Sequence, residues 1–116
     1  MNYDAVVAEI LKNELREAVP VYHDTAPETY DKYPFVVYTT LSVMPSHADN
    51  RTRGYVHTVR ITIVSKNGST KDLERRIINA MENAGYVWSA LRPTVESREY
   101  GEKYTAIEFQ NLYLMD

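Results

Sequence analysis

The feature that most constrains the fold is a stretch near the middle of the chain, residues 55–64, in which apolar and polar side chains alternate. A period of two is typical of a β-strand with one buried and one wetter face, and β-branched residues favour a pleated sheet. The sequence therefore predicts a long strand, which we place at the centre of a sheet. Its two sets of side chains are Val59, Ile61 and Ile63 on the buried face and Thr58, Arg60 and Thr62 on the other.

The length of 116 residues, without a repeat or low-complexity segment, predicts a single domain over residues 1–116. No cysteine is present, which excludes disulfides and thiolate metal sites. The net charge of −3 argues against a general nucleic-acid binder. The first residues include Asp4 and Glu9 and form no apolar core, so we expect no signal peptide. No apolar run approaches the roughly 20 residues that span a bilayer, so we expect no membrane partner.

Helix and strand patterns recur on both sides of the central stretch. The expected elements are a helix from Asn2 to about Glu17, an edge strand Val19–Tyr22, a strand Tyr33–Leu41, a helix from Ser69 or Thr70 to Gly85, a strand Tyr86–Leu91 and a last strand from Lys103 to about Met115. Ser69 with Asp72 resembles a capping box for the second helix. We predict an α+β fold, in which a single, mainly antiparallel sheet of about four to five strands carries two helices packed on one face.

The strand that begins at Tyr33 is apolar on both faces, which is typical of a strand covered on both sides. One parity holds Phe35, Val37, Leu41 and Val43, and the other holds Val36 and Tyr38. The stretch that follows, Pro45–Gly54, is rich in turn-forming residues and joins two long strands. We expect it to be an extended hairpin arm or a mobile loop. Its candidate contact residues, toward another subunit or a lumen, are His47, Asp49, Arg51 and Arg53.

The last strand carries a change of parity near its end. Thr105, Ile107 and Phe109 share one face, whereas Leu112 and Leu114 fall on the face of the polar residues before them. Three explanations fit: a β-bulge, a chain end that leaves the sheet, or a cover of these leucines by another subunit. Leu112 and Leu114 are therefore candidate interface residues.

Two features of composition favour self-association. Ten tyrosines stand against two phenylalanines and one tryptophan, and tyrosine is enriched at protein interfaces. We name Tyr30 and Tyr33 as candidate interface residues; the alternative is that the tyrosines cover sheet edges within one subunit. Residues 1–31 hold seven acids and two bases, and residues 47–76 hold seven bases and three acids. Opposite zones of this kind attract copies head to tail, although such local imbalances also arise by chance.

No catalytic or metal-binding motif is present. His23, His47 and His57 lack the spacing of a zinc site, the four glycines form no phosphate loop, and no nucleophile–base set stands out. His57 lies within the central strand, where we expect a structural histidine with satisfied hydrogen bonds. We therefore expect no enzyme, no cofactor and no metal.

The order of elements resembles a known family of proteins. A helix of about fifteen residues is followed by a strand that begins Tyr33-Pro34-Phe35-Val36, a loop, the alternating central strand, a helix that ends at Gly85 and a final strand around residues 104–109. This pattern resembles the small tail-completion proteins of long-tailed phages, which are the tail terminator and tail-to-head joining proteins of siphophages and related prophages.

The resemblance implies a non-enzymatic structural role. Members of that family form rings, commonly hexamers, at the end of the tail tube, where they stop tube growth and meet the head connector. The partners expected from it are copies of the same chain, a tail tube protein and a head connector protein, with DNA only passing through the lumen. The expected location is the head–tail junction of the virion, after assembly in the host bacterial cytoplasm. The loop at residues 45–54 would face the lumen or a neighbour.

One alternative from another functional class stays open. A small, non-catalytic ligand-binding or regulatory α+β module would have the same composition and element order. A deep pocket lined by Trp88 and tyrosines would favour that reading, whereas exposed rims suited to copies of the chain favour the structural one.

Overall fold

The computed structural model describes residues 2–16, 18–26, 33–66, 69–91, 95–97 and 101–114, and only the backbone of residues 90, 91 and 95–97. These residues form two helices and six strands, in the order α1 (Tyr3–Leu15), β1 (Val21–His23), β2 (Phe35–Ala48), β3 (Arg51–Ser65), α2 (Lys71–Asn83), β4 (Val87–Leu91), β5 (Val95–Ser97) and β6 (Glu102–Leu114).

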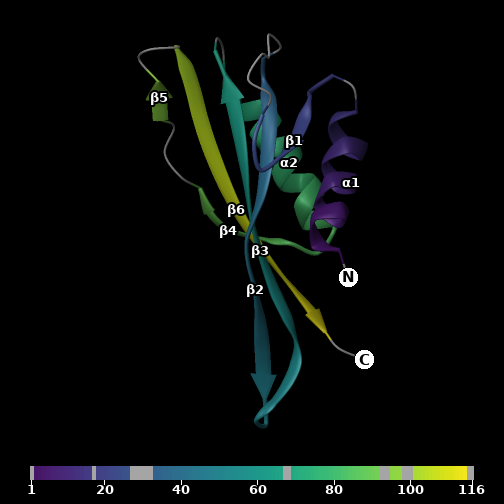
Figure 1. Cartoon of the computed structure of the whole chain (residues 1–116). Helices are drawn as coiled ribbons and strands as arrows, with labels where there is room; N and C mark the ends of the chain where they lie inside the picture. Colours follow the sequence, from purple (N-terminus) through teal and green to yellow (C-terminus); the bar gives the residue numbers. More distant parts are fainter. Residues whose placement is uncertain are drawn as a thin grey trace.

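The strands make one sheet in the order β1-β2-β3-β6-β4, and β5 also pairs with β6. All neighbours are antiparallel except β1 and β2, which run parallel. Both helices lie on one face of this sheet (Figure 1). The predicted α+β fold is therefore confirmed. The alternating stretch is the central strand, as predicted, because β3 lies between β2 and β6.

The core lies between the helices and the sheet. Fully buried side chains of β3 meet those of the neighbouring strands in register, with Val59 opposite Phe109 and Ile61 opposite Ile107. Burial of each such side chain stabilises the fold by about 1.5–3 kcal/mol, which fixes the face that meets the helices. The helices contribute Val7, Leu11 and Leu15 from α1 and Leu73, Ile77 and Met81 from α2.

The helix ends match the expectations in part. The Asn2 side chain accepts a hydrogen bond from the Ala5 amide at 3.1 Å, which caps α1 as predicted. The expected capping box of α2 is wrong. Thr70 occupies the N-cap position without a side-chain cap bond, and the Ser69 hydroxyl accepts from the Lys71 amide at 3.3 Å instead. Asp72 pairs with Arg75 within the helix at 2.5 Å, so it is turned away from the cap.

The parity expected for β2 holds only in its first half. Phe35 and Val37 face away from the helices, opposite Val64 and Thr62. A register shift between Thr40 and Ser42 then inserts one extra residue, so Val43 comes to lie opposite His57, on the helix side. The equal parity predicted for Phe35 and Val43 is therefore wrong, because a bulge reverses the alternation between them.

The β2–β3 hairpin extends well past the helices and gives the molecule an elongated form of 51 × 26 × 25 Å (Figure 1). β1 pairs with β2 only at Val36–Tyr38. Among the described residues, β2 has no strand partner on that outer edge from Thr39 to Ala48. Pro45, which has no N–H, and a bulge between Thr40 and Ser42 interrupt this edge. Such features are how natural sheets protect a free edge against strand addition.

Candidate assembly surface

The far end of the β2–β3 hairpin, which we call the arm (residues 42–58), contains the stretch for which an arm or a loop was predicted. Ala48 pairs with Arg51, so only Asp49 and Asn50 make the turn, with φ of 53° and 61°. Positive φ at both turn positions is the geometry of a type I′ hairpin, which favours Asp and Asn. The hairpin-arm alternative is thus confirmed, and strand pairing extends to the tip.

The four residues singled out in this stretch lie together at the tip of the arm. His47, Asp49, Arg51 and Arg53 are all exposed. An Arg53 nitrogen is 3.6 Å from an Asp49 carboxylate oxygen, and His47 Nδ1 is 3.5 Å from the Thr52 hydroxyl. Exposed ion pairs of this kind contribute little to stability, so they leave the charges available for contacts. Their role toward a neighbour or a lumen stays a prediction.

The structure narrows the explanations for Leu112 and Leu114. β6 stays in unbroken register with β3 up to the pair Gly54–Leu114. There is therefore no bulge between β3 and β6, and the strand remains in the sheet as far as it is described. Both leucines lie on the face turned away from the helices, in the same parity as Glu108 and Gln110, and both are exposed. A bulge between β3 and β6 is thus ruled out as far as β6 is described, and a cover of these leucines by another subunit stays a prediction.

Gly54 explains how β6 can follow the arm so closely. A Cβ at this position would lie 2.2 Å from the Tyr113 carbonyl oxygen and 2.9 Å from the Leu114 Cα. Both are backbone atoms, which cannot turn aside as a flexible side chain can. The missing side chain thus allows the end of β6 to lie against β3 about halfway along the arm.

The remaining two candidates, both tyrosines, fall elsewhere. Tyr30 lies outside the described residues. The Tyr33 hydroxyl donates to a Glu102 carboxylate oxygen at 2.8 Å, its ring contacts Phe35, and the Lys66 ammonium sits 5.1 Å from the ring centre. The structure therefore does not bring Tyr33 together with the arm residues. Its part in an interface stays a prediction.

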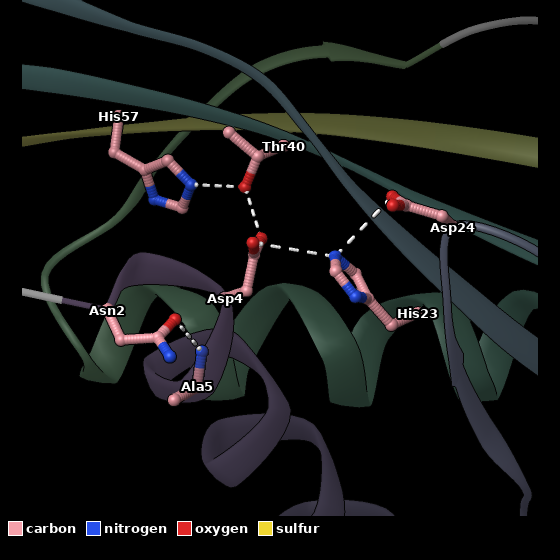
Figure 2. A network of polar contacts seen from close by, with 7 residues as sticks. All are labelled: Asn2, Asp4, Ala5, His23, Asp24, Thr40 and His57. Carbon is pink, nitrogen blue, oxygen red and sulfur yellow. Dashed lines mark hydrogen bonds and ion pairs between the residues drawn. The ribbon is translucent and has the colours of Figure 1, made fainter.

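Five polar side chains form a continuous series of hydrogen bonds at the root of the arm, where β2 and β3 leave the part of the sheet that the helices cover. The Asp4 carboxylate contacts the Thr40 hydroxyl at 2.5 Å, and Thr40 contacts His57 Nε2 at 2.9 Å (Figure 2). His57 Nδ1 lies 2.7 Å from the Tyr86 hydroxyl, which lies 2.9 Å from the Tyr113 hydroxyl. We call these five residues the polar chain.

The direction of every hydrogen bond in the polar chain follows from Asp4, the carboxylate at one end of it. A carboxylate only accepts, so Thr40 donates to Asp4 and must itself accept from Nε2–H of His57. The Nδ1 atom of that ring is then an acceptor for the Tyr86 O–H, and Tyr86 accepts from Tyr113. This arrangement requires a neutral imidazole with its proton on Nε2.

Burial agrees with a neutral imidazole and neutral phenols. The His57 side chain is fully buried, and this desolvation lowers its pKa. The negative charge of Asp4 acts in the opposite direction but is the smaller effect. Burial and the hydrogen bond with Tyr113 raise the pKa of the Tyr86 hydroxyl. The prediction of a satisfied, structural His57 is therefore confirmed: both ring nitrogens have partners.

Asp4 also reaches His23 at the edge of the sheet. His23 Nε2 lies 3.5 Å from carboxylate oxygens of both Asp4 and Asp24, and its ring stacks on Tyr38 with centroids 4.9 Å apart (Figure 2). Burial, with the charges of the two aspartates, raises the pKa of the Tyr38 hydroxyl. His23, Asp4 and Asp24 are all partly exposed here, and the described residues hold no group of three side chains placed to bind a metal ion.

Two hollows are candidates for a bound small molecule. One, of about 810 Å³, lies at the end of α1 beside Lys12, Arg16 and Val21. The other, of about 320 Å³, lies on the face away from the helices, around Arg60. Trp88 lines neither of them. Of the helices within the described ranges, none is both long and apolar enough to cross a bilayer.

Comparisons with known proteins give a likeness of fold. No family model matches the chain, and no curated protein matches it significantly. One similar solved structure is a chain of the virion of a native gene transfer agent particle. It is 13% identical, with 99% of this chain and 89% of that chain covered and a TM-score of 0.52. A second solved protein, known by a sequence identifier alone, is 10% identical, with 100% and 99% covered and a TM-score of 0.54. At these identities the likeness establishes a shared fold over essentially the full length.

Proposed function

We propose that this chain is a structural protein of a phage-like virion and that it catalyses no reaction. The observation that carries the proposal is the full-length match of its fold to a chain of the gene transfer agent virion. A fold alone does not specify a function, so the surface must agree with it. The exposed leucines of β6 and the long, free arm do agree, since both suit contacts with other proteins.

Within the virion, we place the chain at the head–tail junction. There it would act as a tail terminator or tail-to-head joining protein, assembled as a ring, with a tail tube protein on one side and a head connector protein on the other. The order of elements supports this assignment, as does the arm, whose exposed tip is available to a lumen or a neighbour. The chain's net charge of −3 suits a lumen through which DNA passes without being gripped.

Deletion of the gene in the genome that encodes this chain tests the role. We expect particles in which heads and tails are separate and tail tubes vary in length, seen by electron microscopy, with recovery when the gene is supplied on a plasmid. A gold-labelled epitope at the chain's N-terminus should mark the junction in complemented particles. Normal particles from the deletion strain, or absence of the protein from purified particles by mass spectrometry, would reject the structural role. Label elsewhere in the particle would reject only the location.

A second candidate function, a ligand-binding module, rests on the hollow around Arg60. One guanidinium nitrogen of Arg60 lies 3.3 Å from a Glu108 carboxylate oxygen, whereas its buried Nε has no hydrogen-bond partner. A ligand anion in the hollow would meet the positive charge of the Arg60 guanidinium, which lines it. Thermal unfolding in the presence of acetate, citrate and inorganic phosphate tests this. A rise of the unfolding temperature in the unmodified protein, lost in Arg60→Lys, would favour it, and no rise with any of the three would reject it.

A further inference from the structure

The arm and the strand ends beside it carry exposed apolar side chains on both faces of the sheet. We call the face turned away from the helices the outer face and the opposite one the inner face. The outer face exposes Met44 (60%), Val87 (66%), Leu112 (48%) and Leu114 (71%), and the inner face exposes Val43 (39%), Tyr55 (37%) and Trp88 (45%).

The pairing registers assign each residue to its face. Residues directly opposite one another in neighbouring strands share a face. Met44, Val56 and Leu112 are successive partners across β2, β3 and β6, so they form one apolar row on the outer face. On the inner face, Val43 is the partner of the buried His57, and Trp88 is the partner of the buried Phe109. The two apolar surfaces therefore lie back to back on one sheet.

The edge of the arm is a poor place for a partner to bind. A partner strand would need a regular row of N–H and C=O groups along β2. Pro45 offers no N–H, and the extra residue of β2 between Thr40 and Ser42 breaks the regular row before it. Contacts that cover the arm must therefore be made through side chains, face to face, at the spacing of packed sheets, about 10 Å.

We propose that the occupant of each face is a second copy of this chain, with the outer face of one arm packed on the inner face of the next. This rests on the proposed function, and it specifies which surfaces make the contact between subunits. Foreign proteins could cover both faces only as two different partners, one for each face. Copies related head to tail cover both faces of every arm, because the two faces are different and each finds its complement on the same molecule. Such heterologous contacts close into a ring or continue as a filament.

The proposal also makes a statement about forces. A contact between the acidic first segment and the basic middle of the chain would weaken at about 1 M salt, where charges are screened within roughly 3 Å. An apolar contact between arm faces persists there, since burial of apolar surface does not depend on charge. Persistence of the assembly at high salt is therefore expected.

Two complementary variants test the contact. The outer variant carries Leu112→Glu and Leu114→Glu, and the inner variant carries Val43→Glu and Tyr55→Glu. In each variant one face is intact, but the face that it would pack against carries glutamates in every other copy. Each variant alone should therefore be monomeric by size-exclusion chromatography with light scattering. Mixed together, they should form a 1:1 dimer that grows no further. Asn13→Glu with Asn79→Glu, two exposed positions on the helices, is the control with equal added charge and should assemble like the unmodified chain.

Each other outcome overturns the inference. A dimer of the inner variant alone would indicate that outer faces pair with each other. Unchanged assembly of both variants would indicate another surface, and a monomeric unmodified chain at every concentration would indicate no self-contact, while the virion role would still stand or fall by the deletion test. Should circular dichroism show that a double variant does not fold, Met44→Glu and Trp88→Glu serve as the single-site outer and inner variants.

Discussion

Removal of one hydroxyl from the polar chain, by Tyr86→Phe, should have an effect far larger than the size of the change. The ring of Tyr86 keeps its packing, and only the bonds to His57 Nδ1 (2.7 Å) and to the Tyr113 hydroxyl (2.9 Å) are lost. His57 is fully buried, so water cannot replace the donor at Nδ1. A buried acceptor left without a partner costs about 1–3 kcal/mol, and we expect a loss of about 2 kcal/mol. For a chain of this length that corresponds to a fall in unfolding temperature of roughly 8 °C.

The matched control is Tyr113→Phe, which removes the same atom one step further along the polar chain. Tyr113 is only half-buried, and in this variant Tyr86 still donates to His57. We expect a loss below about 1 kcal/mol. Urea unfolding, followed by the fluorescence of the single tryptophan and by circular dichroism, measures both losses. Equal losses in the two variants, or a Tyr86→Phe protein as stable as the original, would refute the direction assigned to these hydrogen bonds.

Three further predictions concern the effect of pH, the glycine in the middle of the arm and the turn at its tip. Burial lowers the pKa of His57 from its ordinary value of 6.5, so below that pH the unfolded chain takes up this proton before the folded one does. The free energy of unfolding should therefore decline as the pH falls below 6.5. The variant His57→Gln, although less stable at pH 7, should lose stability less steeply with falling pH, measured by urea unfolding at several pH values. An equal dependence on pH in both proteins would contradict the assignment. Gly54→Ala places a methyl group against the backbone of β6 and should cost about 2 kcal/mol, with faster amide hydrogen exchange in residues 111–114; unchanged exchange would argue against the close approach. Asn50→Val should lower stability by about 1 kcal/mol because of the positive φ of 61°, whereas Asn50→Gly should not, and thermal unfolding of the pair measures the difference.

Local patterns in the sequence were sufficient for both helices, for all the described strands except β5 and for the central place of β3. Alternation in residues 55–64 and a helical stripe in each helix are properties of neighbouring residues, and they survive in the structure. What the sequence could not reveal is how the strands slide past one another. The bulge after Thr40 carries no glycine or other signal, yet it moves Val43 from one face of the sheet to the other.

The difference between patterns within one strand and pairing between strands also explains which parts of the candidate site could be predicted. Leu112 and Leu114 were visible because their parity conflicts with that of Phe109 within one strand. Met44 was missed, because its face depends on the bulge and on a partner in another strand. The polar chain was missed as a unit, since its five members come from five separate segments. They are Asp4, Thr40, His57, Tyr86 and Tyr113, which only the completed fold brings together.

The one-way order of donors in the polar chain has a consequence for the order in which the helix and the arm become fixed. Its final acceptor, Asp4, belongs to the first turn of α1, whereas His57 belongs to the strand from which the arm extends. A newly made copy whose first helix has not yet docked leaves the Thr40 hydroxyl and, behind it, the imidazole without their ordered partners. We therefore expect the arm to become rigid only after the N-terminal helix has docked on the sheet.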